Sequence, residues 1–231
     1  MAYFKISIII PVLNEAAILH HFLARFPFRD DREVILVDGG SQDQTLALAQ
    51  AFPINVVPSP QPGRGHQLNY GASLAQAEIL LFLHLDTVLP IDFQDQIVET
   101  LGRPGVIAGA FRFRVDLPGL TYRCLEQLVN WRSQAWNLPY GDQGLFVRAR
   151  TFRALGGFAA LPIMEDYEWV QRAKARGRIG LAQRAILTSG RRWQKLGLLR
   201  TTLINQVMIL GYHAGIDPTR LAQWYRQGLR G

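Results

Sequence analysis

The chain reads Ile79-Leu80-Leu81-Phe82-Leu83-His84-Leu85-Asp86 between residues 79 and 86. Its first five residues form a continuous apolar run, which is short for a helix and typical of a strand buried on both faces of a parallel sheet. Asp86 follows at the carboxyl end of that strand, where open α/β sheets bind their ligands. The stretch therefore predicts a parallel sheet with a carboxylate at its ligand-binding edge.

Two earlier apolar runs end in the same way. The run 6–10 leads into Pro11-Val12-Leu13-Asn14-Glu15, and the run 33–37 leads into Asp38-Gly39-Gly40-Ser41. Because the carboxyl ends of parallel strands meet at one edge of a sheet, the acidic residues that follow the three strands are expected to form one polar site.

Strand and helix patterns alternate over the first 110 residues, which predicts a doubly wound sheet. Ser41, with Gln44 three residues later, has the spacing of a capping box for the helix that follows the second strand. The other predicted elements of this half are a strand at 54–57 and helices at 15–26, 64–75 and 91–101.

The second half of the chain has a less regular pattern. A strand is expected at 106–115, with Phe111 and Phe113 on one face and Arg112 and Arg114 on the other. Its predicted helices span residues 120–136, with an inner stripe of Leu125, Leu128 and Val129, residues 165–176, and two segments of the tail, 196–211 and 218–229.

Composition indicates a folded α/β protein. The 231 residues are 48% hydrophobic, and Cys124 is the only cysteine, which excludes an intrachain disulfide and suits a reducing compartment. The first residues lack the pattern of an export signal, and no run reaches the roughly 18 apolar residues of a membrane span. These features lead us to expect a cytoplasmic protein, with peripheral contact at the inner face of the membrane left open.

Charge is distributed unevenly along the chain. Residues 1–110 contain 6 basic and 11 acidic side chains, whereas residues 111–231 contain 19 and 7. The basic half would suit a phosphorylated substrate, an anionic lipid surface or a nucleic acid, and it would equally serve as a solvated surface.

Four motifs together resemble the family 2 glycosyltransferases of the GT-A fold, over roughly residues 5–195. In chain order they are Ile9–Glu15, Val37–Thr45, His84–Asp86 and Met164–Glu168. The stretches Gly63–Gln67 and Tyr140–Gly144 further resemble a bacterial subgroup labelled radical-SAM- or selenodomain-associated transferases.

This resemblance implies a fold and a division of the chain. Residues 1–195 would form a GT-A type (Rossmann-like) α/β domain with a mostly parallel sheet flanked by helices. Within it, residues 1–110 would bind the nucleotide-sugar and residues 111–195 the acceptor. Residues 196–231 would form a C-terminal helical extension, packed on the domain or placed at a dimer or membrane surface.

The resemblance also implies the residues of the donor and acceptor sites. The expected donor contacts are Pro11, Leu13, Glu15, Asp38, Gly39, Arg64, His84, Leu85 and Asp86, with Arg191 and Arg192 on the diphosphate. The expected acceptor contacts are Gly141, Asp142, Gln143 and Trp193.

Asp86 is expected to bind Mn²⁺ or Mg²⁺, because it matches the second Asp of the family's Asp-x-Asp motif and such ions prefer oxygen ligands. His84 stands where the first Asp of that motif would be. It is expected to contact the ribose or phosphate, or to fill space, rather than to bind the ion directly.

The acidic pair Glu165-Asp166 matches the catalytic Glu-Asp pair of the family. Asp166 is expected to accept the proton of the attacking hydroxyl, with Asp142 as the reserve candidate. Ser189 stands where processive relatives have Gln, which argues against a polymer synthase and favours transfer of a single sugar.

The function expected from the sequence is thus an inverting, metal-assisted transfer of one sugar from a nucleotide-sugar, with a preference for uridine, to a hydroxyl or carboxyl acceptor. One alternative is a sugar-phosphate nucleotidyltransferase, which should have a glycine-rich loop directly after the first strand. Another is a basic nucleic-acid-binding module, for which Phe111-Arg112-Phe113-Arg114 offers the only interleaved pattern.

The sequence specifies the partners of the protein less closely than its reaction. The acceptor could be a small metabolite, a lipid or a protein side chain, and nucleic acid is not expected as a partner. A homodimer and contact with an anionic membrane stay open, the latter because Leu196, Leu199, Leu203, Val207 and Leu210 recur at helical spacing.

Overall fold

The computed structural model describes residues 5–230, which are built around one sheet in the order β3-β2-β1-β4-β7-β6-β8-β5. The strands are β1 (Ile6–Val12), β2 (Arg32–Asp38), β3 (Asn55–Pro58), β4 (Ile79–Phe82), β5 (Thr87–Val88), β6 (Val106–Val115), β7 (Phe146–Arg148) and β8 (Arg178–Thr188). The helices are α1 (Ala16–Arg25), α2 (Thr45–Ala49), α3 (Arg64–Leu74), α4 (Phe93–Gly102), α5 (Leu120–Ala135), the 3₁₀ turn η1 (Gly141–Gln143), α6 (Ala149–Ala154), α7 (Glu165–Lys174), α8 (Arg191–Leu196), α9 (Leu198–His213) and α10 (Pro218–Arg230).

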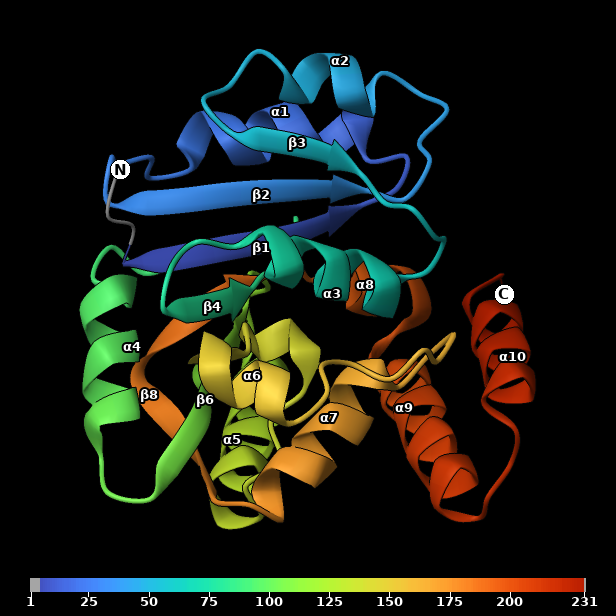
Figure 1. Cartoon of the computed structure of the whole chain (residues 1–231). Coiled ribbons are helices and arrows are strands. Elements are labelled where there is room, and N and C mark those ends of the chain that lie inside the picture. Colours follow the sequence, from blue (N-terminus) through green and yellow to red (C-terminus); the bar gives the residue numbers. More distant parts are fainter. Residues whose placement is uncertain (1–4, 231) are drawn as a thin grey trace.

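The first four strands form a parallel sheet with β1 at its centre (Figure 1). In its register, Ile8 lies opposite Val34 on one side and Leu81 on the other. Successive side chains point to opposite faces of a strand, so each face needs its own cover. Helix α3 covers the face that contains Ile9, and α1 covers the face that contains Ile8. The predicted order of strands and helices in this half is confirmed, except that the short strand β5 between β4 and α4 was not predicted.

The predicted capping box after β2 is wrong. Helix α2 begins at Thr45, and the Ser41 hydroxyl accepts the Asn14 N–H at 2.8 Å instead. The Thr45 hydroxyl likewise accepts the Glu15 N–H at 2.9 Å, and Asp43 accepts the Ala16 N–H at 3.1 Å. The β2–α2 loop therefore caps the start of α1, a contact across about 30 residues that a local motif does not reveal.

The second half extends the sheet with mixed directions. Strand β7 runs antiparallel to both β4 and β6, whereas β6 and β8 run parallel to each other. Phe111 and Phe113 are buried and Arg112 and Arg114 are exposed, as the alternation predicted. The sheet is therefore parallel from β3 to β4 and mixed beyond it.

Helix α5 packs with polar residues inside, which corrects the predicted stripe. Leu128 is exposed, whereas Glu126 is buried and accepts the Val115 N–H at 2.8 Å. Asn130 bonds both the N–H and the carbonyl of Phe113, at 2.7 and 3.0 Å. Beyond β7 the edge of β6 has no neighbouring strand on this side, so α5 supplies side chains that satisfy its backbone.

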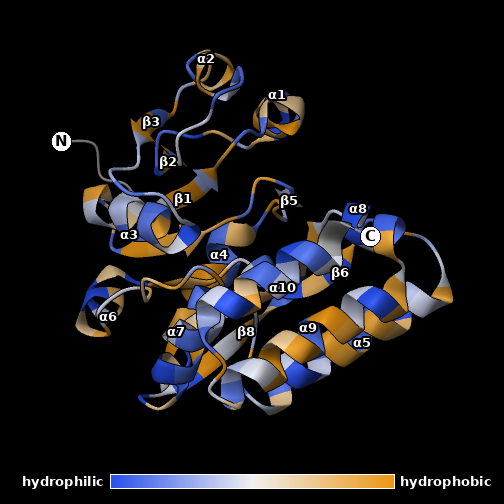
Figure 2. Ribbon diagram, turned by 90° about the vertical axis from the view of Figure 1, so that its right-hand side faces the viewer, coloured by the Kyte–Doolittle hydropathy of each residue, from blue (hydrophilic) through white to orange (hydrophobic). Residues whose placement is uncertain are grey.

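The last three helices complete the core on one side of the molecule (Figures 1 and 2). Met208 of α9 and Leu221 of α10 are buried within the same apolar cluster as residues of α3 and α7. No helix among residues 5–230 has both the length and the apolar character needed to cross a membrane.

Candidate active site

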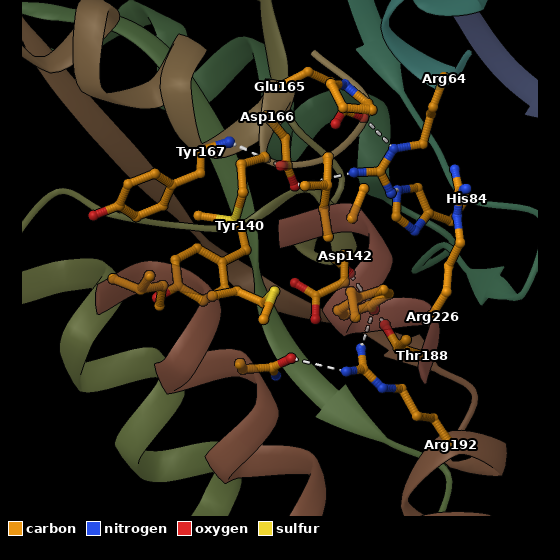
Figure 3. A pocket seen from close by; sticks show the side chains of 18 of the residues that line it. Arg64, His84, Tyr140, Asp142, Glu165, Asp166, Tyr167, Thr188, Arg192 and Arg226 are labelled. Atoms are coloured by element: carbon orange, nitrogen blue, oxygen red, sulfur yellow. Dashed lines mark hydrogen bonds and ion pairs between the residues drawn. The ribbon is translucent and has the colours of Figure 1, made fainter. Parts of the chain in front are cut away.

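A pocket of ≈ 520 Å³ lies where the carboxyl end of β4 faces the start of α7. Residues that lie far apart in the sequence, from Arg64 to Arg226, converge on it (Figure 3). Its polar lining includes Arg64, His84, Asp86, Tyr140, Asp142, Glu165, Asp166, Thr188, Arg192, Asn205, Tyr225 and Arg226.

Arg64 joins the donor half of the chain to the acidic pair. Its Nε donates a hydrogen bond to Glu165, and its Nη2 lies 3.6 Å from Asp166 Oδ2. Glu165 is almost fully buried, so its carboxylate is committed to Arg64. Burial would lower the pKa of Arg64, but the two carboxylates outweigh it and raise that pKa. In the ligand-free structure, Glu165 therefore holds Arg64 at the pocket.

Asp166 is held in one orientation by the protein backbone. Its Oδ2 accepts the Gly141 N–H and its Oδ1 accepts the Tyr167 N–H, both at 2.8 Å. Burial alone would raise the pKa of Asp166, but the charge of Arg64 and these two N–H groups outweigh it and lower that pKa. Asp166 is therefore ionised at neutral pH, with its carboxylate fixed at the start of α7 as predicted.

Asp142 faces the same pocket in a different electrostatic state. Its Oδ1 is buried without a hydrogen-bond partner. Burial, opposed by Arg132 and reinforced by Asp166 and Asp86, raises the pKa of Asp142 to about 6. Two of the carboxylates that line the pocket therefore differ in charge state: Asp166 is ionised at neutral pH, whereas Asp142 has a pKa of about 6.

His84 is neutral at physiological pH. Burial and the adjacent Arg64 lower the pKa of His84 to about 4, and Arg64 Nη1 lies 3.4 Å from His84 Nε2. Figure 3 shows the His84 ring beside Arg64. An uncharged imidazole can contact a sugar or phosphate oxygen without adding charge to the site.

Asp86 lies at the pocket edge in an ion pair with Arg191, whose Nη2 is 3.7 Å from Asp86 Oδ2. Burial raises the pKa of Asp86, and the charge of Arg191 partly opposes this. Burial also raises the pKa of Glu15, on which the charges of Arg191 and Asp86 both act. The ends of β1 and β4 therefore meet at one edge, as predicted.

Asp38 closes the end of β2 at the same sheet edge, outside the pocket lining. Its Oδ2 accepts the N–H groups of Gly40 and Ser41, both at 2.9 Å. Its Oδ1 is buried without a partner. Gly39 beside it is tightly packed, since an added Cβ would lie 3.0 Å from the Gln67 amide. Asp38 therefore keeps one acceptor unused at the strand edge.

Three of the residues predicted to contact a ligand are held by the protein in ways that limit such contact. The Leu85 side chain is buried in the core, which leaves only its backbone for a ligand. Gln143 is fully buried, and its amide bonds Ser133 at 2.8 Å and the Phe111 carbonyl at 3.0 Å, so it holds the loop instead of contacting an acceptor. Gly141 acts through its N–H on Asp166, and an added Cβ would collide with that carboxylate.

The remaining predicted contacts lie at the end of β1 and on α8. Leu13 is exposed and Pro11 half-buried at the end of β1, at the same sheet edge as Asp38 and Asp86. Arg192 is turned away from Asp86, because its Nη1 donates to the Tyr225 hydroxyl at 2.6 Å and its Nη2 to Asn205 at 2.9 Å. Trp193 lines the pocket and packs against Phe113.

Sequence reasoning missed the wall contributed by the tail. Asn205 of α9 and Tyr225 and Arg226 of α10 line the pocket, as do the apolar side chains of Met208, Ile209 and Ala222. The sequence predicts a helical tail packed on the domain or at a dimer or membrane surface, but its helical spacing does not indicate which of its residues would line a pocket. The residues Arg192 and Tyr225, which are 33 positions apart, are brought together only by the packing of α8 and α10.

Comparison with known proteins identifies the family. The family model described as Glycosyl transferase family 2 matches residues 7–161. A PGL/p-HBAD biosynthesis glycosyltransferase of Mycobacterium bovis is 39% identical over 97 residues, covering 38% of this chain and 38% of that protein. The corresponding protein of Mycobacterium tuberculosis gives the same values. The chain thus matches 38% of the length of these curated relatives.

Solved structures with a similar fold include proteins in complex with nucleotide-sugars, one of them named as a mannosyltransferase. S. aureus TarS in complex with UDP-GlcNAc has a TM-score of 0.61 and 18% identity, covering 80% of this chain and 58% of that one. The mannosyltransferase PcManGT from Pyrobaculum calidifontis in complex with GDP-Man and Mn²⁺ has a TM-score of 0.64 and 19% identity, covering 99% and 72%. These similarities confirm the predicted GT-A type α/β fold and give no support to the finer radical-SAM or selenodomain label. Since the family model covers more than half of its residues, the chain belongs to glycosyl transferase family 2.

Proposed function

We propose that the protein transfers one sugar from a nucleotide-sugar, with UDP as the leading nucleotide, to a hydroxyl or carboxyl group of an acceptor, with inversion. The observation that carries this proposal is the arrangement of three carboxylates. Asp38 and Asp86 follow strands on either side of β1, and Asp166 lies on a separate element that faces the same pocket. Nucleotide binding at such a strand edge is general for open α/β sheets.

We place the nucleotide at the sheet edge where β1, β2 and β4 end, and the sugar in the pocket beside Asp86. The unused Oδ1 of Asp38 is an acceptor suited to an N–H of a base, and a uracil ring presents one. The similar TarS structure was solved with UDP-GlcNAc, which supports a uridine donor, whereas PcManGT was solved with GDP-Man. The choice of base is therefore part of the test below.

A divalent cation fits the residues at this edge only together with the donor. Asp86 offers one carboxylate, and residues 5–230 contain no group of three acidic, His or Cys side chains arranged to hold an ion alone. Mg²⁺ and Mn²⁺ are commonly bound by one or two carboxylates plus substrate phosphates. Asp86 would hold the ion, which stabilises the negative charge that develops on the departing diphosphate.

Two arginines are placed to move onto the diphosphate. In the ligand-free protein Arg64 pairs with Glu165 and Asp166, and Arg191 pairs with Asp86. A diphosphate offers both guanidinium groups a more highly charged, bidentate partner than these carboxylates. Movement of Arg64 toward it would also weaken the charge that lowers the pKa of Asp166, which makes this carboxylate a stronger base in the donor complex.

The chemical step is a direct displacement. Asp166 accepts the proton of the acceptor hydroxyl while the hydroxyl oxygen bonds to the anomeric carbon of the sugar. The bond from that carbon to the diphosphate oxygen breaks, and its electron pair leaves with the nucleoside diphosphate. For a carboxylate acceptor, no proton needs to be removed.

The two alternative functions fit the structure less well. A nucleotidyltransferase needs free backbone N–H groups after β1 to hold phosphates, but side chains of the β2–α2 loop already accept those of Asn14, Glu15 and Ala16. The interleaved stretch Phe111–Arg114 does not form a base-stacking surface, because the rings of Phe111 and Phe113 are buried.

A thermal-shift panel of UDP, GDP, ADP and CDP, each with and without Mn²⁺, tests this function. A ligand at 100 times its Kd adds about 2.7 kcal/mol to the free energy of unfolding. For a domain of this size that is an increase in Tm of about 5 to 10 °C. We expect UDP with Mn²⁺ to give the largest increase. The absence of any shift with every nucleotide, in either metal condition, would overturn the proposed function.

A further inference from the structure

Helix α9 is apolar on two opposite sides. Its inner side packs Met208 and Ile209 against the apolar cluster that contains Tyr167 and Leu221. Its outer side carries four large side chains at helical spacing, with exposed fractions of 85% for Leu199, 64% for Leu203, 40% for Val207 and 67% for Leu210. A helix that covers a domain usually has a polar outer face, so this outer face is expected to be covered by a partner.

Helix α5 adds exposed apolar side chains in the same part of the molecule. Both views place α5 and α9 in the part of the molecule away from β1–β3 (Figures 1 and 2). Trp131 and Trp136 pack edge to face at 5.4 Å between ring centroids, and both are more than half exposed. Tryptophan is enriched at the boundary between the lipid tails and water, where an apolar ring with one N–H is well accommodated.

The charge around α9 indicates what the partner is. Between residues 189 and 228, Arg191 pairs with Asp86 and both Arg192 and Arg226 line the pocket. The other basic side chains of this segment are Lys195, Arg200 and Arg220, against one acidic side chain, Asp217. Lys195 and Arg200, next to the outer face of α9, are exposed. In a symmetric dimer built on this face, the basic rim of one copy would meet the basic rim of the other, which is unfavourable. An anionic lipid surface provides both an apolar interior and the opposite charge.

We propose that the outer face of α9, together with its basic rim, docks on the surface of an anionic lipid bilayer. Insertion of Leu199, Leu203 and Leu210 into the headgroup region supplies the apolar contribution to binding. Lys195 and Arg200, which form the basic rim, supply the electrostatic contribution. The inner side of α9 lines the pocket through Asn205, Met208 and Ile209. Docking would therefore place α9 between the pocket and the lipid surface. The proposal concerns the surface alone and does not depend on the proposed transfer reaction.

Co-flotation of the full chain with vesicles tests the docking. We expect the protein to float with vesicles that contain phosphatidylglycerol, to float much less with pure phosphatidylcholine, and to lose binding as salt screens the charges. The double variant Leu203→Glu/Leu210→Glu should lower the partition coefficient at least about ten-fold, because it replaces two inserted apolar side chains by charges. Val98→Glu on α4 is the matched control, since Val98 is 52% exposed and lies on another side of the molecule. This control should bind like the unchanged protein.

Two outcomes would overturn the docking proposal. One is that the unchanged protein does not float with anionic vesicles at low salt, or that the double variant floats equally well while its thermal melt confirms a folded chain. The other is that light scattering reports a dimer that Leu203→Glu/Leu210→Glu converts to a monomer without any loss of vesicle binding. The α9 face would then be an interface between two copies of this chain.

Discussion

Replacing Asp166 by Asn should lower the rate of sugar transfer by about 10² to 10⁴, while the affinity for the nucleoside diphosphate stays within a few-fold. The amide has nearly the size of the carboxylate and can still accept one of the two backbone N–H groups that hold Asp166, but it cannot take the acceptor's proton. The measurement is the transfer rate at saturating donor, together with calorimetric titration of the nucleoside diphosphate into both proteins.

Asp142→Asn is the comparison that makes this prediction discriminating. Asp142 faces the same pocket, and its pKa of about 6 alone would make it the better base near neutral pH. If Asp142 were the base, the rate of the unchanged enzyme would rise as pH passes about 6, and Asp142→Asn would lose both this rise and most of its rate. Near-normal transfer by Asp166→Asn combined with a large loss in Asp142→Asn would show that the proposed roles are reversed.

Replacing Asp86 by Ala should abolish the part of nucleotide binding that depends on the cation. In the unchanged protein we expect Mn²⁺ to strengthen binding of the nucleoside diphosphate about ten-fold or more, which corresponds to about 1.4 kcal/mol and about 3 to 5 °C in Tm. In Asp86→Ala this increment should vanish, and transfer should fall by about 10² to 10³. The ligand-free Tm should not fall, because burial raises the pKa of Asp86 and its charge therefore does not stabilise the fold.

Asp92→Ala is the matched control for this variant. Asp92 pairs with Arg184 at 3.4 Å, much as Asp86 pairs with Arg191 at 3.7 Å, and their side chains are exposed to a similar extent, 31% and 32%. It lies outside the pocket, so its loss should leave the Mn²⁺ increment intact. A Mn²⁺ increment that survives in Asp86→Ala would mean that other residues hold the ion.

Much of the nucleotide half could be predicted from the sequence, because its strands are buried on both faces. Continuous apolar runs such as 79–83 have few alternatives to a buried parallel strand, and their order along the chain then brings Glu15, Asp38 and Asp86 to one edge. The helix boundaries differ from the predictions by one or two residues at most positions, because capping depends on loops that are distant in the sequence. The capping of α1 by Ser41 and Thr45 is the example in this chain.

The second half was less predictable because its packing uses polar groups. The inner side of α5 contains Glu126 and Asn130, which bond the free edge of β6, so an apolar stripe was the wrong signal for its orientation. Strand β8 mixes exposed polar with buried apolar residues without a clear period and was not anticipated. Local patterns report burial against an apolar core and do not report such edge contacts.

The candidate site, too, could be predicted only in part. Its carboxylates were predicted from the strand ends and from the family resemblance, whereas their partners were not. The pairing of Arg64 with Glu165 spans 101 positions, and the wall that Asn205 and Tyr225 contribute depends on how the tail folds back. Such contacts depend on tertiary packing, which local patterns in a single sequence do not specify.

The most direct test of the nucleotide-sugar account is a crystal structure of the protein with Mn²⁺ and the nucleoside diphosphate that gives the largest thermal shift. The account predicts the base beside Asp38 at the end of β2, and the diphosphate between Asp86 and the guanidinium groups of Arg64 and Arg191. A nucleotide bound instead in the second groove of the molecule, which is lined by Arg114, Arg123, Arg184 and Leu187, would contradict it.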